Sequence, residues 1–341
     1  MARAADLSAP AARSDLQKGI LMPLPAILSR RFDVPVFGAP LFILSDPKLV
    51  IAQCVAGIIG AFPALNARPA SQLDEWIHEI TEALAAHDKL HPERPAGPFA
   101  VNQIVHRTNE RLEHDLEVAV KRKVPLVITS LGAREDVNAA VHSYGGIVMH
   151  DVISDAFAHK AVEKGADGLI AVAAGAGGHA GKISPFALVH EIRAWFDGPL
   201  ALSGAIATGG GVLAARAMGA DFAYLGTPFV ATHECRASED YKQAIVAGAS
   251  KDIVGTSQFT GVFGNYLKAS IIKGGFDPDT LPTENLKTMD FQKATADGPK
   301  PWKDIWGGGQ GIGAIKEVVS VAELVARLQR EYSDARARLS L

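Results

Sequence analysis

Short apolar runs alternate with longer segments of helical period along most of the chain. The runs are rich in β-branched and other apolar residues, which is typical of strands that are covered on both faces. We expect eight such strands, at residues 34–40, 57–63, 99–105, 126–132, 146–152, 167–173, 199–205 and 222–228.

Helical segments lie between these strands, at residues 71–86, 109–121, 154–164, 184–196 and 210–218, and another closes the chain at 321–337. In the segment 71–86, Ser71 is expected to cap the helix, and apolar side chains follow at helical spacing, at Leu73, Ile77, Ile80 and Leu84. The repeated alternation predicts an α/β fold in which parallel strands close into a (β/α)8 TIM barrel. An open doubly wound sheet is the alternative, but eight strands in unbroken alternation favour closure.

The regular pattern loosens at the start of the chain and after the eighth strand. Residues 1–20 are expected to form a flexible tail, and the barrel is assigned to residues 21–249 and 313–341. Residues 250–312 hold many Gly, Pro, Thr and Lys, with a short helical run near 266–272. Because a segment of this length inside one domain is usually functional, we expect a lid-like insertion there.

Composition and charge exclude several classes of function. Of the 341 residues, 48% are apolar and 21% are charged, and the net charge is −3 with both signs interspersed, so no nucleic-acid partner is expected. No run approaches the roughly 18 apolar residues of a membrane span, and the first residues lack a secretory pattern. Cys54 and Cys235 lie far apart, without disulfide or metal-site spacing. We therefore expect a soluble, cytoplasmic protein with no metal site.

The sixth expected strand ends in a glycine-rich loop, Ala173-Ala174-Gly175-Ala176-Gly177-Gly178-His179-Ala180-Gly181. Catalytic residues of such barrels lie at the carboxyl ends of the strands, and glycine lets the backbone approach a ligand closely. Imidazole titrates near neutral pH, so His179 is a candidate for proton transfer. The alternative is a flexible turn with a solvated histidine, but so many glycines at one strand end favour a site. His150 is a second candidate, although its apolar neighbours favour a packing role.

The seventh and eighth expected strands end in Ser203-Gly204-Ala205 and Gly226-Thr227. The loops at these two positions of a barrel often bind phosphate through backbone N–H groups and a helix N-terminus. We expect Gly204, Ala205, Gly226 and Thr227 to supply such donors. A glycine run before a helix is commonly only a turn, but two adjacent strand ends together favour an anion site.

Two other strands carry residues suited to a flat ring. The first strand ends in Gly38-Ala39-Pro40, where small residues leave room against the backbone. The third strand carries Asn102 in an apolar run, and a buried amide must find hydrogen-bond partners. Asn102 bonds either the rim of a ring system or a neighbouring loop, and the residue type leaves both readings open.

With these residues in view, the chain resembles the nitronate monooxygenase (2-nitropropane dioxygenase) family of flavin barrels. The matching pieces keep the family's order: Gly38-Ala39-Pro40, Asn102, Gly177-Gly178-His179, Ser203-Gly204-Ala205, Gly226-Thr227 and Gly309-Gln310-Gly311. The resemblance implies that these residues bind FMN at the barrel mouth, with the phosphate on the loops after strands seven and eight. It also implies that His179 faces the flavin and the substrate.

Three positions depart from the family's pattern. Relatives often place a lysine after the histidine of strand five, whereas His150 is followed here by Asp151. Relatives often have glycine where this chain has Ala205, and we expect a negative φ there, since alanine avoids positive φ. The stretch 261–265 lacks an arginine that many members have.

The resemblance implies FMN-dependent oxidation of alkyl nitronates or nitroalkanes by O2, with a small-molecule substrate. The redox chemistry belongs to the flavin, and the protein supplies positioning and electrostatics. One alternative is an NAD(P)H-dependent reductase of quinones or enoyl thioesters on the same barrel. Another is a barrel that binds a phosphorylated ligand without turnover. The sequence leaves the oligomeric state open, with a homodimer as one option.

Overall fold

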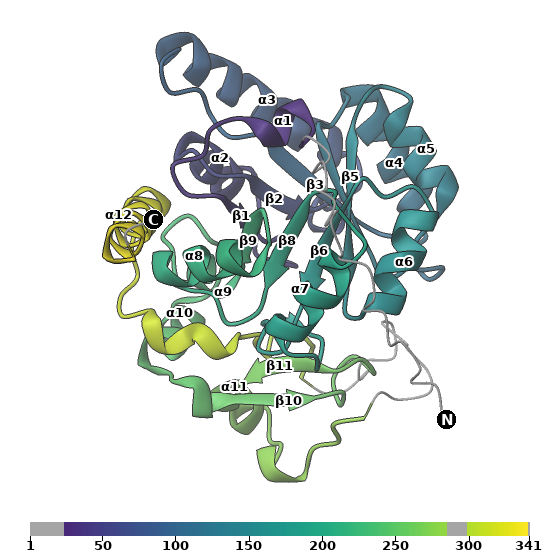
Figure 1. The fold of residues 1–341 in the computed structure, drawn as a ribbon. Helices are drawn as coiled ribbons and strands as arrows, with labels where there is room; N and C mark the ends of the chain where they lie inside the picture. Colours follow the sequence, from purple (N-terminus) through teal and green to yellow (C-terminus); the bar gives the residue numbers. More distant parts are fainter. Residues whose placement is uncertain (1–23, 285–298, 340–341) are drawn as a thin grey trace, which may run out of the picture.

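The computed structural model describes residues 24–284 and 299–339, so the expected tail at residues 1–20 lies outside the described residues (Figure 1). The parallel strands coincide with the eight expected apolar runs, each shortened by one to four residues. They are β1 (Val36–Gly38), β2 (Gly60–Pro63), β3 (Phe99–Ile104), β4 (Leu126–Ser130), β5 (Ile147–Val152), β6 (Gly168–Val172), β8 (Leu200–Ser203) and β9 (Phe222–Leu225).

The eight strands pair in the order β1-β9-β8-β6-β5-β4-β3-β2, with parallel neighbours throughout. β1 and β2, at the two ends of this order, meet through a parallel bridge between Phe37 and Ile59. In this bridge the amide of Gly38 donates to the carbonyl of Ile59 at 2.7 Å. The barrel predicted from the alternation of strands and helices is confirmed.

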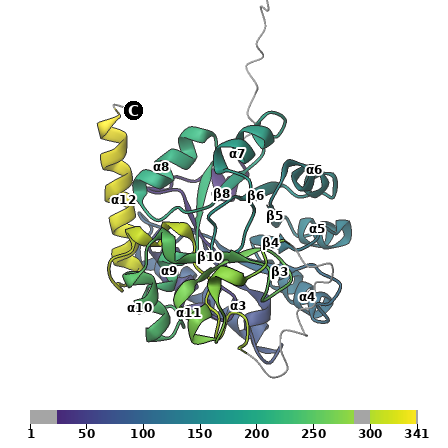
Figure 2. The ribbon, with the colours of Figure 1, turned by 90° about the horizontal axis from the view of Figure 1, so that it is seen from below.

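Helices surround the strands, as the view along the barrel shows (Figure 2). They are α1 (Ala26–Ser29), α2 (Pro47–Val55), α3 (Gln72–Leu90), α4 (Leu112–Arg122), α5 (Glu135–His142), α6 (Asp155–Glu163), α7 (Pro185–Arg193), α8 (Gly209–Met218), α9 (Thr227–Val230), α10 (Glu239–Ala247), α11 (Lys268–Lys273) and α12 (Val321–Arg338). Short 3-10 turns lie at η1 (Ala64–Asn66), η2 (Ser250–Asp252), η3 (Pro278–Thr280) and η4 (Gln310–Ala314).

The predicted helix at 71–86 is confirmed, but the capping role expected for Ser71 is wrong. Ser71 itself has a helical backbone, and its side chain makes no capping bond. The carbonyls of Pro69 and Ala70 accept from the amides of Gln72 and Leu73 instead. The first amides of α3 are therefore satisfied by a backbone turn.

The interior of the barrel is closed at one end and open to loops at the other. Large side chains fill it, among them Phe37, Met149 and Phe222. Leu28 of α1 packs against this interior core, and α1 lies at the end opposite β10 and β11 (Figure 1). The site must therefore lie at the other end, where the parallel strands finish.

The segment 250–312 contains regular structure that the sequence pattern did not predict. β10 (Ile253–Thr256) and β11 (Gly264–Leu267) pair antiparallel, and β11 pairs with β7 (Gly178–His179) in the glycine-rich loop. The helical run expected near 266–272 begins only at Lys268, because Tyr266 belongs to β11. This small sheet and α11 lie across the carboxyl end of the barrel (Figures 1 and 2).

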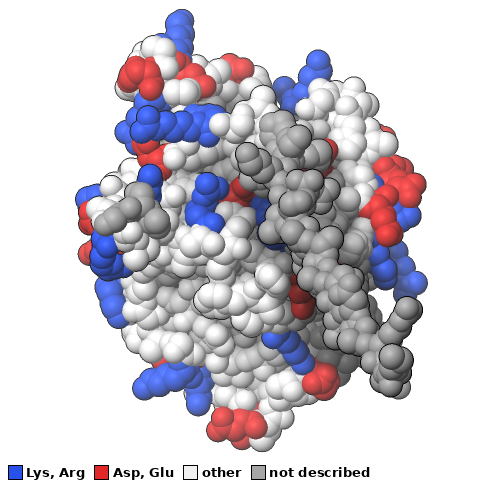
Figure 3. Space-filling view, viewed as in Figure 1, with Lys and Arg blue, Asp and Glu red and all other residues white. Residues whose placement is uncertain are grey.

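Basic and acidic side chains are interspersed on the face shown in Figure 3, as the sequence predicts. Within residues 24–284 and 299–339, no helix is both long and apolar enough to span a membrane.

Candidate active site

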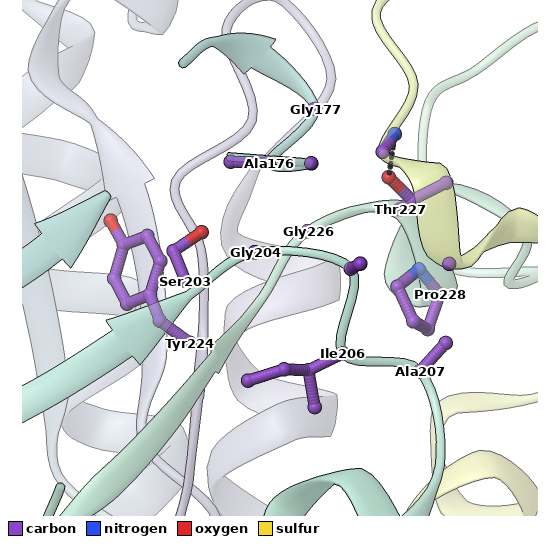
Figure 4. A pocket seen from close by; sticks show the side chains of 14 residues that line it. Ala176, Gly177, Ser203, Gly204, Ile206, Ala207, Tyr224, Gly226, Thr227 and Pro228 are labelled. Atoms are coloured by element: carbon purple, nitrogen blue, oxygen red, sulfur yellow. Dashed lines mark hydrogen bonds between the residues drawn. The ribbon is translucent and has the colours of Figure 1, made fainter. Parts of the chain in front are cut away.

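Four loops meet at the carboxyl end of the barrel and line a small, partly open pocket. The loops follow β6, β8 and β9, and the fourth is the glycine-rich stretch around residue 309. In Figure 4, Ser203 and Tyr224 lie on one side of the pocket and Thr227 and Pro228 on the other. The lining residues are Gly175, Ala176, Gly177, Ser203, Gly204, Ala205, Ile206, Ala207, Tyr224, Gly226, Thr227, Pro228, Gly309 and Gly311.

Close backbone approach in this pocket requires glycine at position 177. A methyl group on Gly177 would lie 2.7 Å from the nitrogen of Gly309 and 3.0 Å from the hydroxyl oxygen of Thr227. The amide of Gly309 donates to that hydroxyl at 3.0 Å (Figure 4). Because the hydroxyl of Thr227 accepts this bond, its own proton can be donated to a ligand.

The expectation of a negative φ at Ala205 is wrong. Its φ is +55°, in the left-handed region that costs a non-glycine residue roughly 1–2 kcal/mol. The conformation is held from both sides. The amide of Ala205 donates to the carbonyl of Gly175 at 3.2 Å, and a methyl group on Gly311 would lie 2.5 Å from the carbonyl oxygen of Ala205. The Ala205 amide is therefore engaged within the protein, whereas the sequence reasoning made it a donor to the anion.

The start of α8 is capped by the protein's own side chains. The hydroxyl of Thr208 accepts from the amide of Gly211 at 3.1 Å, and the carboxylate of Glu331 in α12 accepts from the amide of Gly209 at 2.7 Å. These two amides are thus engaged as well. The donors that remain toward the pocket belong to the loops rather than to the first turn of α8.

His179 lies in β7, where it pairs with Gly264 of the segment 250–312. Its Nε2 atom lies 3.0 Å from the hydroxyl oxygen of Thr260. The Thr260 hydroxyl also lies 3.1 Å from the carbonyl oxygen of Val262, to which it can donate, so it is able to accept a hydrogen bond from Nε2 of His179. Burial lowers the pKa of His179 to about 4, which keeps the ring neutral near pH 7.

The segment 250–312 also contacts the glycine-rich loop that carries His179. The side-chain nitrogen of Asn265 donates to the carbonyl of Ala176 at 2.6 Å. The ring of Trp302 lies edge-on to the ring of His179, with the two centroids 5.2 Å apart. Trp302 and Gly178 both have positive φ, at +69° and +71°. Sequence reasoning missed Thr260, Asn265 and Trp302, since no local pattern connects them with the glycine-rich loop.

A chain of polar groups crosses the inward-facing side of β3, β4 and β5. The amide nitrogen of Asn102 donates to the carbonyl of Ile128 at 3.1 Å and to the hydroxyl of Ser130 at 2.7 Å. Ser130 donates in turn to Oδ2 of Asp151 at 2.6 Å. Of the two readings left open for Asn102, these bonds favour the bracing of a neighbouring strand. Burial raises the pKa of Asp151 to about 6, and the hydrogen bond from Ser130 opposes this shift.

The residues at the end of β1 contact two different parts of the protein, the helix α2 and the barrel interior. A methyl group on Gly38 would lie 2.3 Å from the side-chain nitrogen of Gln53, so the glycine makes room for α2 rather than for a ring. Ala39 packs against the barrel interior, and its amide donates to the carbonyl of Leu225 at 2.8 Å. Pro40 follows and is half-buried.

Of the remaining predicted residues, some line the pocket and others make contacts only within the protein. The amide of Gln310 donates to the carbonyl of Gly175 at 2.9 Å, while its side chain is exposed. Gly311 lines the pocket. His150 is buried with its Nδ1 atom 2.5 Å from the hydroxyl of Thr129, and burial lowers its pKa to about 4. The packing role favoured for His150 agrees with these contacts.

Comparisons with known proteins identify the family of the chain. The nitronate monooxygenase family pattern matches residues 34–331. A nitronate monooxygenase of Paraburkholderia phytofirmans is 27% identical over 375 residues, covering 93% of this chain and 96% of the relative. A (3aS,4S,5R,7aS)-5-hydroxy-7a-methyl-1-oxo-octahydro-1H-indene-4-carboxyl-CoA dehydrogenase of Rhodococcus jostii is 23% identical over 229 residues, covering 67% of this chain and 61% of the relative.

Solved structures share the fold. The nitroalkane oxidase of Streptomyces ansochromogenes superposes with a TM-score of 0.73 at 23% identity, covering 92% of this chain and 100% of that one. FabK of Thermotoga maritima gives a TM-score of 0.71 at 23% identity, covering 92% and 96%. The family match, which spans most of the chain, confirms the resemblance seen in the sequence: this chain belongs to the nitronate monooxygenase family and is an oxidoreductase.

Proposed function

We propose that this protein binds FMN and oxidises nitroalkanes or alkyl nitronates with O2 as the electron acceptor. The observation that carries the proposal is the state of His179. A neutral imidazole, anchored through Nε2 by Thr260, stands on the glycine-rich loop whose preceding residues line the pocket. A neutral imidazole is a suitable base for a proton on carbon.

The residues of the pocket fit the phosphate end of FMN. The lining residues include no lysine or arginine, so backbone amides and the Thr227 hydroxyl would hold the phosphate. Gly177 lets the loop around Gly309 approach closely, and Gly204, Gly226 and Gly311 lie on the walls. In this proposal Ser203, Ala39 and Asn102 would hold the rest of FMN, between the pocket and the barrel interior. When bound, FMN would accept electrons from the substrate carbon and pass them to O2.

The role of His179 depends on the charge of the substrate. With a neutral nitroalkane, the imidazole of His179 takes the proton from the carbon that carries the nitro group, and the electron pair of the broken C–H bond moves into the nitro group. The resulting anion stabilises the imidazolium beside it. Thr260 keeps the ring in one orientation throughout, because its hydroxyl is fixed by the carbonyl of Val262. A nitronate has already lost this proton, and His179 then only orients it.

A second candidate function is NAD(P)H-dependent reduction of a quinone or an enoyl thioester on the same barrel. The similarity to a relative named as a carboxyl-CoA dehydrogenase favours it. This function would use the same FMN contacts and the same base. It differs in the electron donor, since a reductase would require NAD(P)H.

Anaerobic mixing separates these functions. Purified yellow protein is mixed with a nitroalkane, with its nitronate and with NADH, and the flavin absorbance near 450 nm is followed in each case. We expect bleaching by the nitro compounds. Bleaching by NADH alone would favour the reductase, and a colourless protein would favour a barrel that binds a phosphorylated ligand without turnover.

A further inference from the structure

Asp151 is the last inward-facing residue of β5 at the carboxyl end of the barrel. Side chains alternate along a strand, and Met149, two positions earlier, belongs to the interior core. Oδ2 of Asp151 accepts a hydrogen bond from Ser130. Oδ1 is buried and has no hydrogen-bond partner among the described residues. One carboxyl oxygen is thus hydrogen-bonded within the protein, whereas the other is buried without a partner among the described residues.

The polar chain determines which oxygen can carry a proton. Asn102 donates to Ser130, and Ser130 donates its only proton to Oδ2 of Asp151. Oδ2 is therefore an acceptor in this chain, and a proton on Asp151 must sit on Oδ1. In that form Asp151 presents an O–H donor at the mouth of the barrel.

The groups around Asp151 leave its charge uncompensated. Ser130 of β4 is its hydrogen-bond donor, and Tyr224 of β9 is the titratable group coupled to it: burial and the charge of Asp151 raise the pKa of Tyr224. None of the ion pairs formed by the described residues includes Asp151. Burial raises the pKa of Asp151 itself to about 6, so the acid form is accessible near neutral pH.

We propose that Asp151 is a catalytic residue that, in its acid form, donates a hydrogen bond from Oδ1 to the substrate oxygen on which negative charge develops. The substrate class is a planar group with such an oxygen: a nitro or nitronate group under the proposed function, on which this role rests. A carboxyl kept neutral by its surroundings can stabilise an oxyanion in this way. In its ionised form Asp151 repels the same oxygen, so one residue sets both affinity and its dependence on pH.

Inorganic nitrate is a suitable probe, because it is a planar oxyanion that is not turned over. Its dissociation constant is measured by titration calorimetry from pH 5 to pH 8 on the purified protein. Between pH 5 and pH 8 we expect the affinity of the unaltered protein to fall by about 100-fold, since only the acid form of Asp151 binds. Asp151→Asn keeps an N–H donor that cannot ionise. It should bind nitrate within about threefold of the unaltered protein at pH 5 and change little with pH.

Two further variants complete the test. Asp151→Leu removes the donor and should weaken nitrate binding about tenfold at pH 5. Ser130→Ala removes the hydrogen bond that favours the carboxylate, so the fall in affinity should move to higher pH. An unchanged pH dependence in Asp151→Asn, or unchanged affinity in Asp151→Leu, would overturn the proposal. Calorimetry requires no turnover, so the result is distinguishable from a failure of nitroalkane to bleach the flavin.

Discussion

The Nε2 atom of His179 lies 3.0 Å from the hydroxyl oxygen of Thr260, although 81 positions separate the two residues in the chain. The barrel supplies the histidine, and the segment that crosses the barrel end supplies its hydrogen-bond partner. This segment is thus more than a cover, because its Thr260 hydroxyl lies within hydrogen-bond distance of a ring nitrogen of His179.

Replacing Thr260 by valine should lower turnover of a neutral nitroalkane by about tenfold, since the lost hydrogen bond frees the ring to take the other tautomer. Oxidation of the pre-formed nitronate should fall less. Thr260→Ser keeps the hydroxyl and is the matched control, with activity close to that of the unaltered protein. Steady-state kinetics with both substrates provides the measurement, and equal losses for both would contradict the role given to Thr260.

The phosphate pocket is tested by substitutions at its glycines. Gly226→Leu places a bulky side chain on the pocket wall, and Gly177→Ala places a methyl group 2.7 Å from the nitrogen of Gly309. Both proteins should fold yet lose their flavin absorbance. Gly210→Ala is the control, because the nearest atom to its new methyl group lies 3.9 Å away. If Gly226→Leu retained a full complement of FMN, the phosphate site would be misplaced.

Strain at Ala205 predicts an effect on stability. Because its φ is +55°, Ala205→Gly should leave the free energy of unfolding unchanged or raise it by up to about 1 kcal/mol. Ala205→Val should lower it by about 1–3 kcal/mol, since β-branched residues tolerate this conformation least. Urea denaturation at constant pH measures both changes, and a large loss of stability in Ala205→Gly would contradict the assignment of strain.

The buried histidines predict how stability depends on pH. Burial lowers the pKa of His150 to about 4, whereas an unfolded histidine titrates near 6.5. The unfolded chain therefore binds the proton first, so stability is fully present above pH 6.5 and is lost as the pH falls toward 4. His150 contributes up to about 3 kcal/mol to this loss.

His179, whose pKa is also lowered, likewise makes the protein less stable as the pH falls. Asp151 has a raised pKa, so its contribution to stability changes with pH in the opposite direction. Urea denaturation of His150→Gln should show a weaker dependence on pH than the unaltered protein, and an identical dependence would contradict this account.

The fold was predictable because its signal is local. Each parallel strand lies in a mostly apolar run, and a helix separates each of these strands from the next. β10 and β11 were not predicted because they lie in a segment without regular alternation, and β11 pairs with β7, which is far away in the chain. The positive φ of Ala205 escaped for a similar reason, since Gly175 and Gly311 impose it from other loops.

For the site, too, local motifs were predictable and contacts between distant elements were not. Motifs at strand ends identified Gly177, Ser203, Gly204, Gly226 and Thr227, which the structure brings together in one pocket. The orientation of each group toward a ligand was not predictable, because it depends on contacts between elements. The amide of Ala205 and the start of α8 illustrate this, since both are engaged by the protein itself.

The central claim is that His179 acts as the base toward carbon. His179→Asn should keep FMN bound and lower turnover of a neutral nitroalkane by about 10²–10⁴-fold. Oxidation of the pre-formed nitronate requires no proton removal and should suffer much less. The most direct measurement is turnover of both substrates by this one variant. Unequal losses, with the nitroalkane affected far more, are the predicted result. Equal losses, or no loss with either substrate, would contradict it.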